Sequence, residues 1–140
     1  MPLYPVIKER FSLHPFNTFH LESVARYFTE VETIEQVHDL LHSEVFQKNP
    51  LLLLGGGSNL LFTGNFKGLV VHLVNKGKEI ISQSGDSVWV KAQAGENWHE
   101  FVSWCIENGF GGLENLSLIP GNVGSCAIQN IEAYGIEVKN

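Results

Sequence analysis

Two clusters of small residues are the parts of the sequence whose composition suggests chemistry. Residues 55–60 begin with three consecutive glycines, and residues 120–135 contain three glycines and one proline; neither stretch contains Lys or Arg. Glycine lets the backbone approach another group closely and adopt positive φ values that turn N–H groups toward an anion. We therefore expect both stretches, the first and second glycine loops, to contact one nucleotide cofactor.

Each loop also has a purely structural interpretation. Glycine clusters often mark tight turns, and the first loop lacks both the helix that follows GxGxxG and the GK[ST] ending of a P-loop. If it holds phosphate, it does so with backbone N–H groups and the side chains of Ser58 and Asn59. The second loop could pack on a sheet, but Gln129 and Asn130 would then need hydrogen-bond partners, which a planar ring with several acceptors would supply.

Other polar residues form no recognisable set of nucleophile, base and orienting group. Glu96 and Glu114 flank a predicted helix and could serve as a general acid and base, although Glu96 is expected instead to interact with the helix N-terminus. His99 is expected at the surface of that helix. Cys105 lies on its apolar stripe and should be a buried, unreactive thiol, whereas Cys126 lies within the second loop and is placed to touch a bound cofactor.

Composition excludes several classes of protein. The chain has 140 residues, of which 44% are hydrophobic and 17% charged, as in soluble globular proteins. Its net charge of −6 argues against nucleic acid or an anionic membrane as a partner. Two cysteines without a CxxC pair, and scattered histidines, indicate no metal site and a reduced, cytoplasmic protein. The longest apolar run, residues 51–54, is too short to span a bilayer, and no leader peptide is visible.

Local patterns predict the elements that position the loops. Thr33 followed by Gln36 is a capping box that starts an amphipathic helix over residues 33–48. A second helix starts near Trp98, and Gly109 occupies the position of its C-terminal cap. Its apolar stripe is expected to comprise Trp98, Phe101, Val102, Cys105 and Ile106. Strands are expected where aromatic and β-branched residues cluster: residues 17–21, 26–31, 51–54, 69–73, 79–83 and 87–94.

The order of these elements indicates an α+β protein with two subdomains, residues 1–67 and 68–140. Residues 1–15 are expected to form an extended lead-in. The strand–helix–strand order that follows favours a parallel sheet with the first glycine loop at a carboxyl strand end, where such sheets bind ligands. In the second subdomain, Gly85-Asp86 is expected to turn a hairpin.

Five ordered motifs carry a resemblance to a known family. They are residues 17–19, 55–62, 94–99, 112–125 and 128–138, so the resemblance runs from about residue 16 to residue 140. At this order and spacing they closely resemble the UDP-N-acetylenolpyruvoylglucosamine reductases. Glu132 and Ala127 stand where the family pattern has Gly and Pro.

The resemblance implies the vanillyl-alcohol-oxidase/PCMH-type FAD-binding fold, with the second of its two α+β subdomains incomplete. It implies FAD as the cofactor and NADPH as the hydride donor of the intact enzyme. That enzyme converts UDP-N-acetylglucosamine enolpyruvate to UDP-N-acetylmuramate for peptidoglycan. The residues expected to contact FAD are Gly55, Gly56, Gly57, Ser58, Asn59, Leu60, Pro120, Gly121, Gly124, Ser125, Cys126, Ile128 and Tyr134.

No residue of this chain matches a catalytic residue of the family. The Arg, the Ser or Cys and the Glu that act on the substrate belong to the part of the family that continues beyond this chain, as does the UDP-sugar domain. The sequence thus predicts the FAD-binding portion of a reductase, inactive by itself. The alternative, favoured by Glu132, is a non-catalytic flavin- or nucleotide-binding module or an interaction protein.

Overall fold

The chain forms two compact units, residues 1–74 and residues 75–140. The computed structural model describes residues 4–138. The sequence pattern predicts a division between residues 67 and 68. The structure places it later, because the strand Phe66–Leu73 (β4) pairs on both sides with strands of the first unit.

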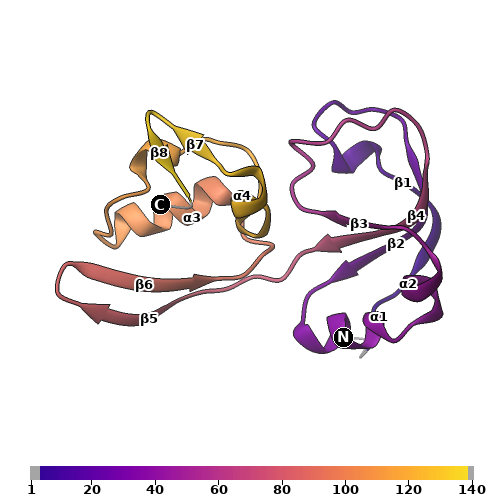
Figure 1. Cartoon of the computed structure of the whole chain (residues 1–140), viewed down its shortest axis with the longest axis horizontal. Helices are drawn as coiled ribbons and strands as arrows, with labels where there is room; N and C mark the ends of the chain where they lie inside the picture. The colour runs from indigo at the N-terminus through magenta and orange to yellow at the C-terminus, as the bar shows by residue number, and fades with distance from the viewer. Residues whose placement is uncertain (1–3, 139–140) are drawn as a thin grey trace. The chain divides into compact units, whose positions relative to one another are not determined.

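A four-stranded sheet with the order β1-β2-β4-β3 is the framework of the first unit (Figure 1). The other strands are β1 (Lys8–Ser12), β2 (Val24–Val31) and β3 (Leu51–Leu54). β2, β3 and β4 run parallel, and β1 pairs antiparallel with β2 at the edge. The predicted parallel sheet is therefore confirmed, with β4 between β2 and β3.

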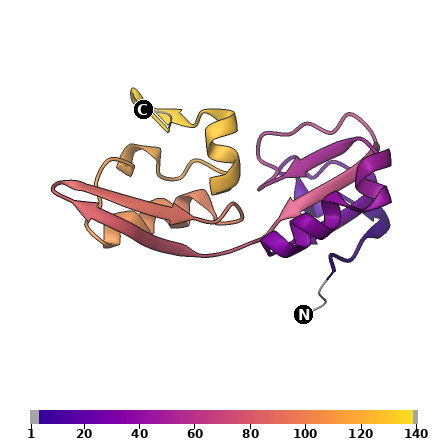
Figure 2. The same ribbon diagram turned by 60° about the horizontal axis from the view of Figure 1, so that its bottom comes forward.

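Apolar residues form a core on each face of this sheet. Val70 of β4 packs with Phe28 and Leu54 in one core, while its neighbours Leu69 and Val71 belong to the other. Successive residues of a strand point to opposite faces, so β4 supplies both cores. The helices α1 (Ile34–Leu41) and α2 (Glu44–Lys48) cover the second core (Figure 2). Their residues packed there are Leu40, Val45 and Phe46.

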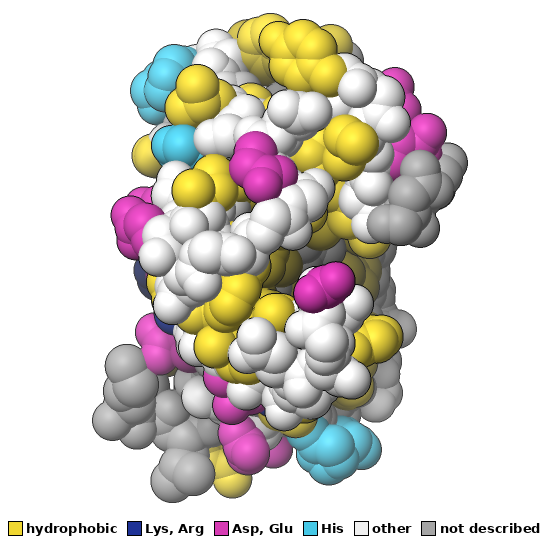
Figure 3. All heavy atoms as spheres, turned by 90° about the vertical axis from the view of Figure 1, so that its left-hand side faces the viewer, with side chains coloured by type: hydrophobic (Ala, Val, Ile, Leu, Met, Phe, Trp, Pro, Cys, Tyr) yellow, Lys and Arg dark blue, Asp and Glu magenta, His cyan; other side chains and the backbone are white. Residues whose placement is uncertain are grey.

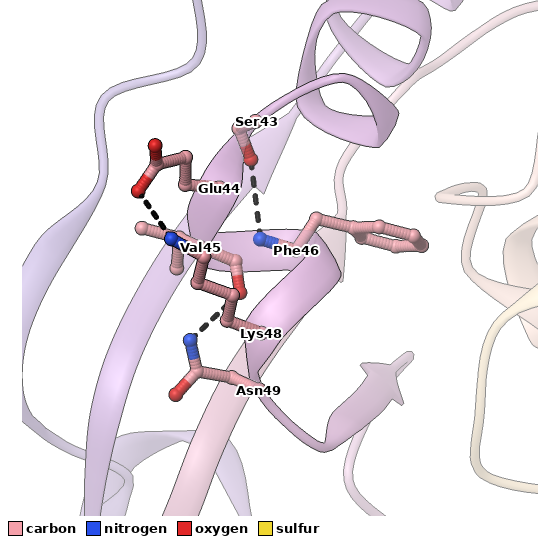
Figure 4. A network of polar contacts seen from close by, with 6 residues as sticks. All are labelled: Ser43, Glu44, Val45, Phe46, Lys48 and Asn49. Atoms are coloured by element: carbon pink, nitrogen blue, oxygen red, sulfur yellow. Dashed lines mark hydrogen bonds and ion pairs between the residues drawn. The ribbon is translucent and has the colours of Figure 1, made fainter.

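The predicted helix over residues 33–48 is two helices. Thr33 caps α1 as predicted, because its side chain accepts a hydrogen bond from the Gln36 N–H. The backbone leaves the helical conformation at Ser43, whose Oγ accepts a hydrogen bond from the Phe46 N–H at 3.2 Å and starts α2 (Figure 4). A serine hydroxyl competes with helical hydrogen bonds in this way, so a periodic apolar pattern alone does not reveal the break.

Near the N-terminus one prediction is incomplete and another is wrong. The extended lead-in contains the edge strand β1, and the predicted strand over residues 17–21 is a turn that follows the 3₁₀ helix η1 (His14–Phe16). The turn forms because the buried Asn17 side chain bonds to local backbone: its Nδ2 donates to Leu13 O at 2.8 Å and its Oδ1 accepts from the Leu21 N–H at 2.9 Å.

The second unit packs helices against a β-hairpin. Its elements are β5 (Lys78–Ser84), β6 (Ser87–Ala92), α3 (Trp98–Glu107), η2 (Glu114–Leu116), α4 (Val123–Gln129), β7 (Glu132–Ala133) and β8 (Ile136–Glu137). The predicted turn between β5 and β6 is confirmed, with Gly85 at φ +55°. The buried core of this unit comprises Trp98, Phe101, Val102, Cys105, Leu116, Cys126 and Ile131.

Helix α3 ends as its sequence predicts. Gly109 has φ +75°, its N–H donates to Ile106 O, and the Phe110 N–H donates to Cys105 O. These two bonds make the Schellman motif. Ile106 is 46% exposed, so this residue of the predicted apolar stripe does not belong to the buried face of α3.

Acidic residues outnumber basic ones by 15 to 9, which gives the net charge of −6. On the face drawn in Figure 3, Asp and Glu side chains are conspicuous and Lys and Arg are scarcely seen. Within residues 4–138, no helix is long and apolar enough to cross a membrane.

Candidate functional site

The first glycine loop follows β3 directly, at the carboxyl end of that strand. Leu60 and Phe62 pack onto the sheet below it. Gly57 has φ +66°, and a Cβ built on it would overlap Phe16 O and lie 3.1 Å from Asn17 Cα. The Thr18 N–H also donates to Gly57 O at 3.3 Å. Glycine is therefore required at position 57, because the Asn17 turn packs directly against the loop.

The same loop retains unused hydrogen-bond donors. Within the described part of the chain, the backbone N–H groups of Gly56, Gly57 and Asn59 donate to no protein acceptor. Asn59 is exposed, and its side chain likewise has no protein partner among the described residues. Backbone donors in a glycine-rich turn suit the oxygens of an anion. The loop can thus bind a phosphate without a Lys or Arg.

The second glycine loop is not irregular throughout, because α4 forms within it. Pro120 and Gly121 precede the helix, and Gly124, Ser125, Cys126 and Ile128 belong to it. The start of α4 lies along residues 94–98: the Val123 N–H donates to Glu96 O and the Gly124 N–H to Ala94 O, both at 2.9 Å. A Cβ on Gly124 would lie 2.6 Å from Ala94 Cβ. Close packing within the second unit therefore explains this glycine.

The residues of the second loop differ in accessibility. Ile128 and Tyr134 are 83% and 90% exposed, and Tyr134 has φ +53° in the turn between β7 and β8. The Cys126 side chain is buried in the core of the second unit. The Asn130 Nδ2 donates to Glu137 Oε2 at 3.1 Å, while its buried Oδ1 has no partner among the described residues. Asn130 Oδ1 is thus a buried acceptor that the described residues leave unpaired.

Both glutamates considered as acid–base candidates have structural roles. Glu96 is 5% exposed, and its carboxylate accepts bonds from the Gly77 N–H at 2.7 Å and Lys78 Nζ at 2.9 Å. Burial raises the pKa of Glu96, but the Lys78 and Gly77 bonds and the charge of Lys76 outweigh it, so the pKa is lowered overall. The exposed Glu114 accepts a bond from the Gly112 N–H at 2.8 Å, and backbone hydrogen bonds lower its pKa.

Residues 116–121 are hydrogen-bonded to the first turn of α3. Trp98 Nε1 donates to Leu116 O at 2.8 Å, and the Trp98 N–H donates to Gly121 O at 3.0 Å. His99 is half-buried rather than a free surface residue, because its Nδ1 contacts Ser117 Oγ and the Leu118 N–H. Sequence reasoning missed this role of His99; spacing alone does not place α3 against a segment so far along the chain.

Among the described residues, neither the thiols nor the acidic side chains form a further reactive or metal-binding site. Cys105 and Cys126 are free and buried, and burial raises the pKa of both. Across residues 4–138, no cluster of three or more His, Cys, Asp or Glu side chains could hold a metal ion.

A family model described as an FAD binding domain matches residues 25–140, which include both glycine loops. The chain belongs to the FAD binding domain family. The residues present fit this cofactor within each unit taken by itself. The first loop offers backbone donors without an acidic side chain, and the second unit offers the unpaired Asn130 Oδ1.

Individual relatives agree with this family and with the resemblance in the sequence. UDP-N-acetylenolpyruvoylglucosamine reductases from Flavobacterium johnsoniae and Pseudomonas putida are 51% and 46% identical over 96% and 95% of this chain. The chain spans 39% of the length of each of these two proteins.

A solved UDP-N-acetylenolpyruvylglucosamine reductase from Thermus caldophilus superimposes with a TM-score of 0.68 at 23% identity. The alignment covers 95% of this chain and 44% of that enzyme. Together with the family match, it confirms the predicted α+β fold of the vanillyl-alcohol-oxidase/PCMH type.

Proposed function

We propose that this chain is the FAD-binding portion of a UDP-N-acetylenolpyruvoylglucosamine reductase. The observation that carries the proposal is a first glycine loop with unused backbone donors, in an FAD binding domain that is 51% identical to such a reductase. We assign residues 1–74 and 75–140 as its two FAD-binding subdomains. The reaction is the NADPH-dependent reduction of UDP-N-acetylglucosamine enolpyruvate in the cytoplasm, a step of peptidoglycan synthesis.

In this proposal each loop has its own task. Backbone N–H groups of the first glycine loop and the Asn59 side chain hold the FAD pyrophosphate. Pro120, Gly121 and the exposed face of α4 that carries Ile128 line the flavin, with Tyr134 beside it. The buried Cys126 contributes through its backbone and through packing, not through its thiol. When bound, FAD supplies the redox chemistry by passing hydride from NADPH to the substrate, and the protein positions it.

No catalytic residue is assigned to this chain. The carboxylates of Glu96 and Glu114 both accept hydrogen bonds from backbone N–H groups of the second unit, and both thiols are buried. We place the groups that act on the UDP-sugar in the remainder of the reductase, because this chain spans 39% of the length of the Flavobacterium johnsoniae relative.

One observation favours a second candidate function, a flavin- or nucleotide-binding module without catalysis. Glu132 is exposed at the start of β7 and lies directly opposite Glu137 of β8. Like charges at such positions destabilise a strand pair, and Glu132 stands where the family pattern has Gly, so the second unit departs from the reductase pattern there. Measured turnover separates this candidate from the reductase.

A chimaera tests the proposal. Residues 25–140 replace the matching segment of the Flavobacterium johnsoniae reductase, and NADPH oxidation is measured with and without UDP-N-acetylglucosamine enolpyruvate. The proposal predicts a yellow, FAD-containing enzyme whose NADPH oxidation depends on the substrate. A folded chimaera that binds FAD without turnover would favour the non-catalytic module, and a folded, colourless chimaera would contradict FAD binding itself.

An isosteric pair of variants locates the phosphate site. Asn59→Asp adds a negative charge to the first glycine loop. Asn65→Asp adds the same charge outside it and keeps an oxygen to accept the Val24 N–H, which Asn65 Oδ1 binds at 3.0 Å. A carboxylate about 4 Å from a phosphate costs about 1 kcal/mol in water-like surroundings, so Asn59→Asp should weaken FAD binding roughly fivefold. Asn65→Asp should leave it unchanged.

A further inference from the structure

We infer that His99 is a positioning residue for the cofactor: it holds the backbone at Ser117 and Leu118 and so sets the path of the second glycine loop. The inference rests on the proposed FAD binding and adds to it a residue that contacts neither the cofactor nor the substrate. Its basis is a pair of hydrogen bonds within the second unit. Ser117 Oγ lies 3.0 Å from His99 Nδ1, and the Leu118 N–H donates to the same nitrogen at 3.3 Å.

The hydrogen bonds define the state of the imidazole. A backbone N–H can only donate, so Nδ1 of His99 is the acceptor and the ring proton is on Nε2. The Ser117 hydroxyl then also donates to Nδ1, so two donors share the single lone pair of this nitrogen. An acceptor at the Nδ1 position is therefore the feature of His99 that the segment needs.

The held segment has a backbone conformation that requires support. Leu118 has φ +62° and is 76% exposed, so no packing of its side chain holds it in the left-handed region. Such conformations persist in non-glycine residues only where the surrounding structure imposes them. Ile119, Pro120 and Gly121 follow immediately, so a change at Leu118 would redirect the predicted flavin contacts.

Neighbouring contacts fix the segment on both sides but not at Leu118. Trp98 holds Leu116 O through its side chain and Gly121 O through its backbone. His99, the next residue of α3, contacts the interval between these two points. Consecutive residues in the first turn of α3 thereby hold residues 116–121 at three points.

Two substitutions distinguish this role from a general structural one. His99→Asn places an amide oxygen close to the Nδ1 position and keeps the acceptor. His99→Gln places its amide where Nε2 was and removes the acceptor from Leu118. Gln is the better helix former of the two, so a defect confined to His99→Gln cannot arise from weakening α3.

The first readout needs no cofactor. Hydrogen exchange of the Leu118 amide should be slow in the wild type and in His99→Asn, and faster in His99→Gln at an unchanged midpoint of unfolding. Equal exchange in all three proteins would overturn the inference, because His99 would then not hold Leu118.

The second readout is FAD affinity, followed by flavin fluorescence. His99→Gln should raise the FAD dissociation constant about 5- to 50-fold, because two hydrogen bonds that hold the loop are lost, and His99→Asn should restore most of the affinity. If the wild type binds FAD and both variants bind equally well, the inference fails while the proposed function stands. If the wild type itself binds no FAD, the proposed function fails and the inference with it.

Discussion

The glycine at position 57 gives the sharpest test of how the first loop is built. Gly57→Ala meets two obstacles at once: φ is +66°, and the new Cβ would overlap Phe16 O. The left-handed conformation costs a non-glycine residue about 1–2 kcal/mol. Forcing an extra carbon into a packed site typically costs about 1–3 kcal/mol, and here the obstructing atoms are backbone that cannot rotate away. We therefore expect Gly57→Ala to lower the free energy of unfolding by about 2–5 kcal/mol.

Three other glycines separate the two causes. Gly109 has φ +75° and no atom within 4 Å of the position a Cβ would take, so Gly109→Ala should show only the conformational cost, about 1–2 kcal/mol. Gly124 has no positive φ but its Cβ would lie 2.6 Å from Ala94 Cβ, so Gly124→Ala should show only the steric cost. Gly64 has neither obstacle, and Gly64→Ala should be neutral or stabilise by up to about 1 kcal/mol.

Urea unfolding followed by far-ultraviolet circular dichroism measures these differences. Tryptophan fluorescence is unsuitable for the first unit, because Trp89, Trp98 and Trp104 all lie in the second. The comparison that decides is Gly57→Ala against Gly64→Ala in the same unit. A difference below about 0.5 kcal/mol, the usual range for neutral surface changes, would refute the claim that the Asn17 turn packs against the loop and requires glycine there.

The remaining predictions concern the second unit. Glu96→Gln should destabilise the chain by about 2 kcal/mol near neutral pH, because the Lys78 ammonium loses its buried carboxylate partner. Since the pKa of Glu96 is lowered from its ordinary 4.5, its contribution is complete above that pH and is lost as the pH falls through the lower folded value. Unfolding measured from about pH 6 to about pH 2 should show this loss in the wild type, and an identical profile in Glu96→Gln would contradict it. Cys105 and Cys126 should react with a disulfide reagent far more slowly in the native chain than in urea, because burial raises the pKa of both thiols; rapid native labelling of either would show that its thiol is accessible.

Local signals are sufficient for much of the fold. Three features each depend on only a few adjacent residues, and the structure contains all of them: the Thr33 cap, the Gly85 turn and the Gly109 cap. The strand at Leu51–Leu54 is predictable because it is short, apolar and followed by glycines. Such elements depend on backbone conformations that only certain residues favour, so a single sequence reveals them.

Other elements depend on partners distant in the sequence. β1 is a polar edge strand that exists because β2 pairs with it. Helix α4 contains a glycine and β-branched residues, which are poor helix formers; hydrogen bonds to the carbonyls of Ala94 and Glu96 fix its first turn. No local sequence pattern indicates these contacts, so the sequence does not predict a helix within the second glycine loop.

The candidate site shows the same limit. Composition locates both glycine loops, but it cannot separate glycines needed for packing from those available to a ligand. Gly57 and Gly124 are explained by Phe16 and Ala94, which only the fold brings close. The sequence places His99 at the surface because its contacts, Ser117 and Leu118, lie beyond the end of its own helix.

Titration of the purified chain with FAD shows directly whether the two glycine loops bind this cofactor. We expect a saturable change to a shifted, structured flavin absorption band, with binding weakened by Asn59→Asp and unaffected by Asn65→Asp. A chain that is folded by circular dichroism yet leaves the FAD spectrum unchanged at every concentration would contradict it.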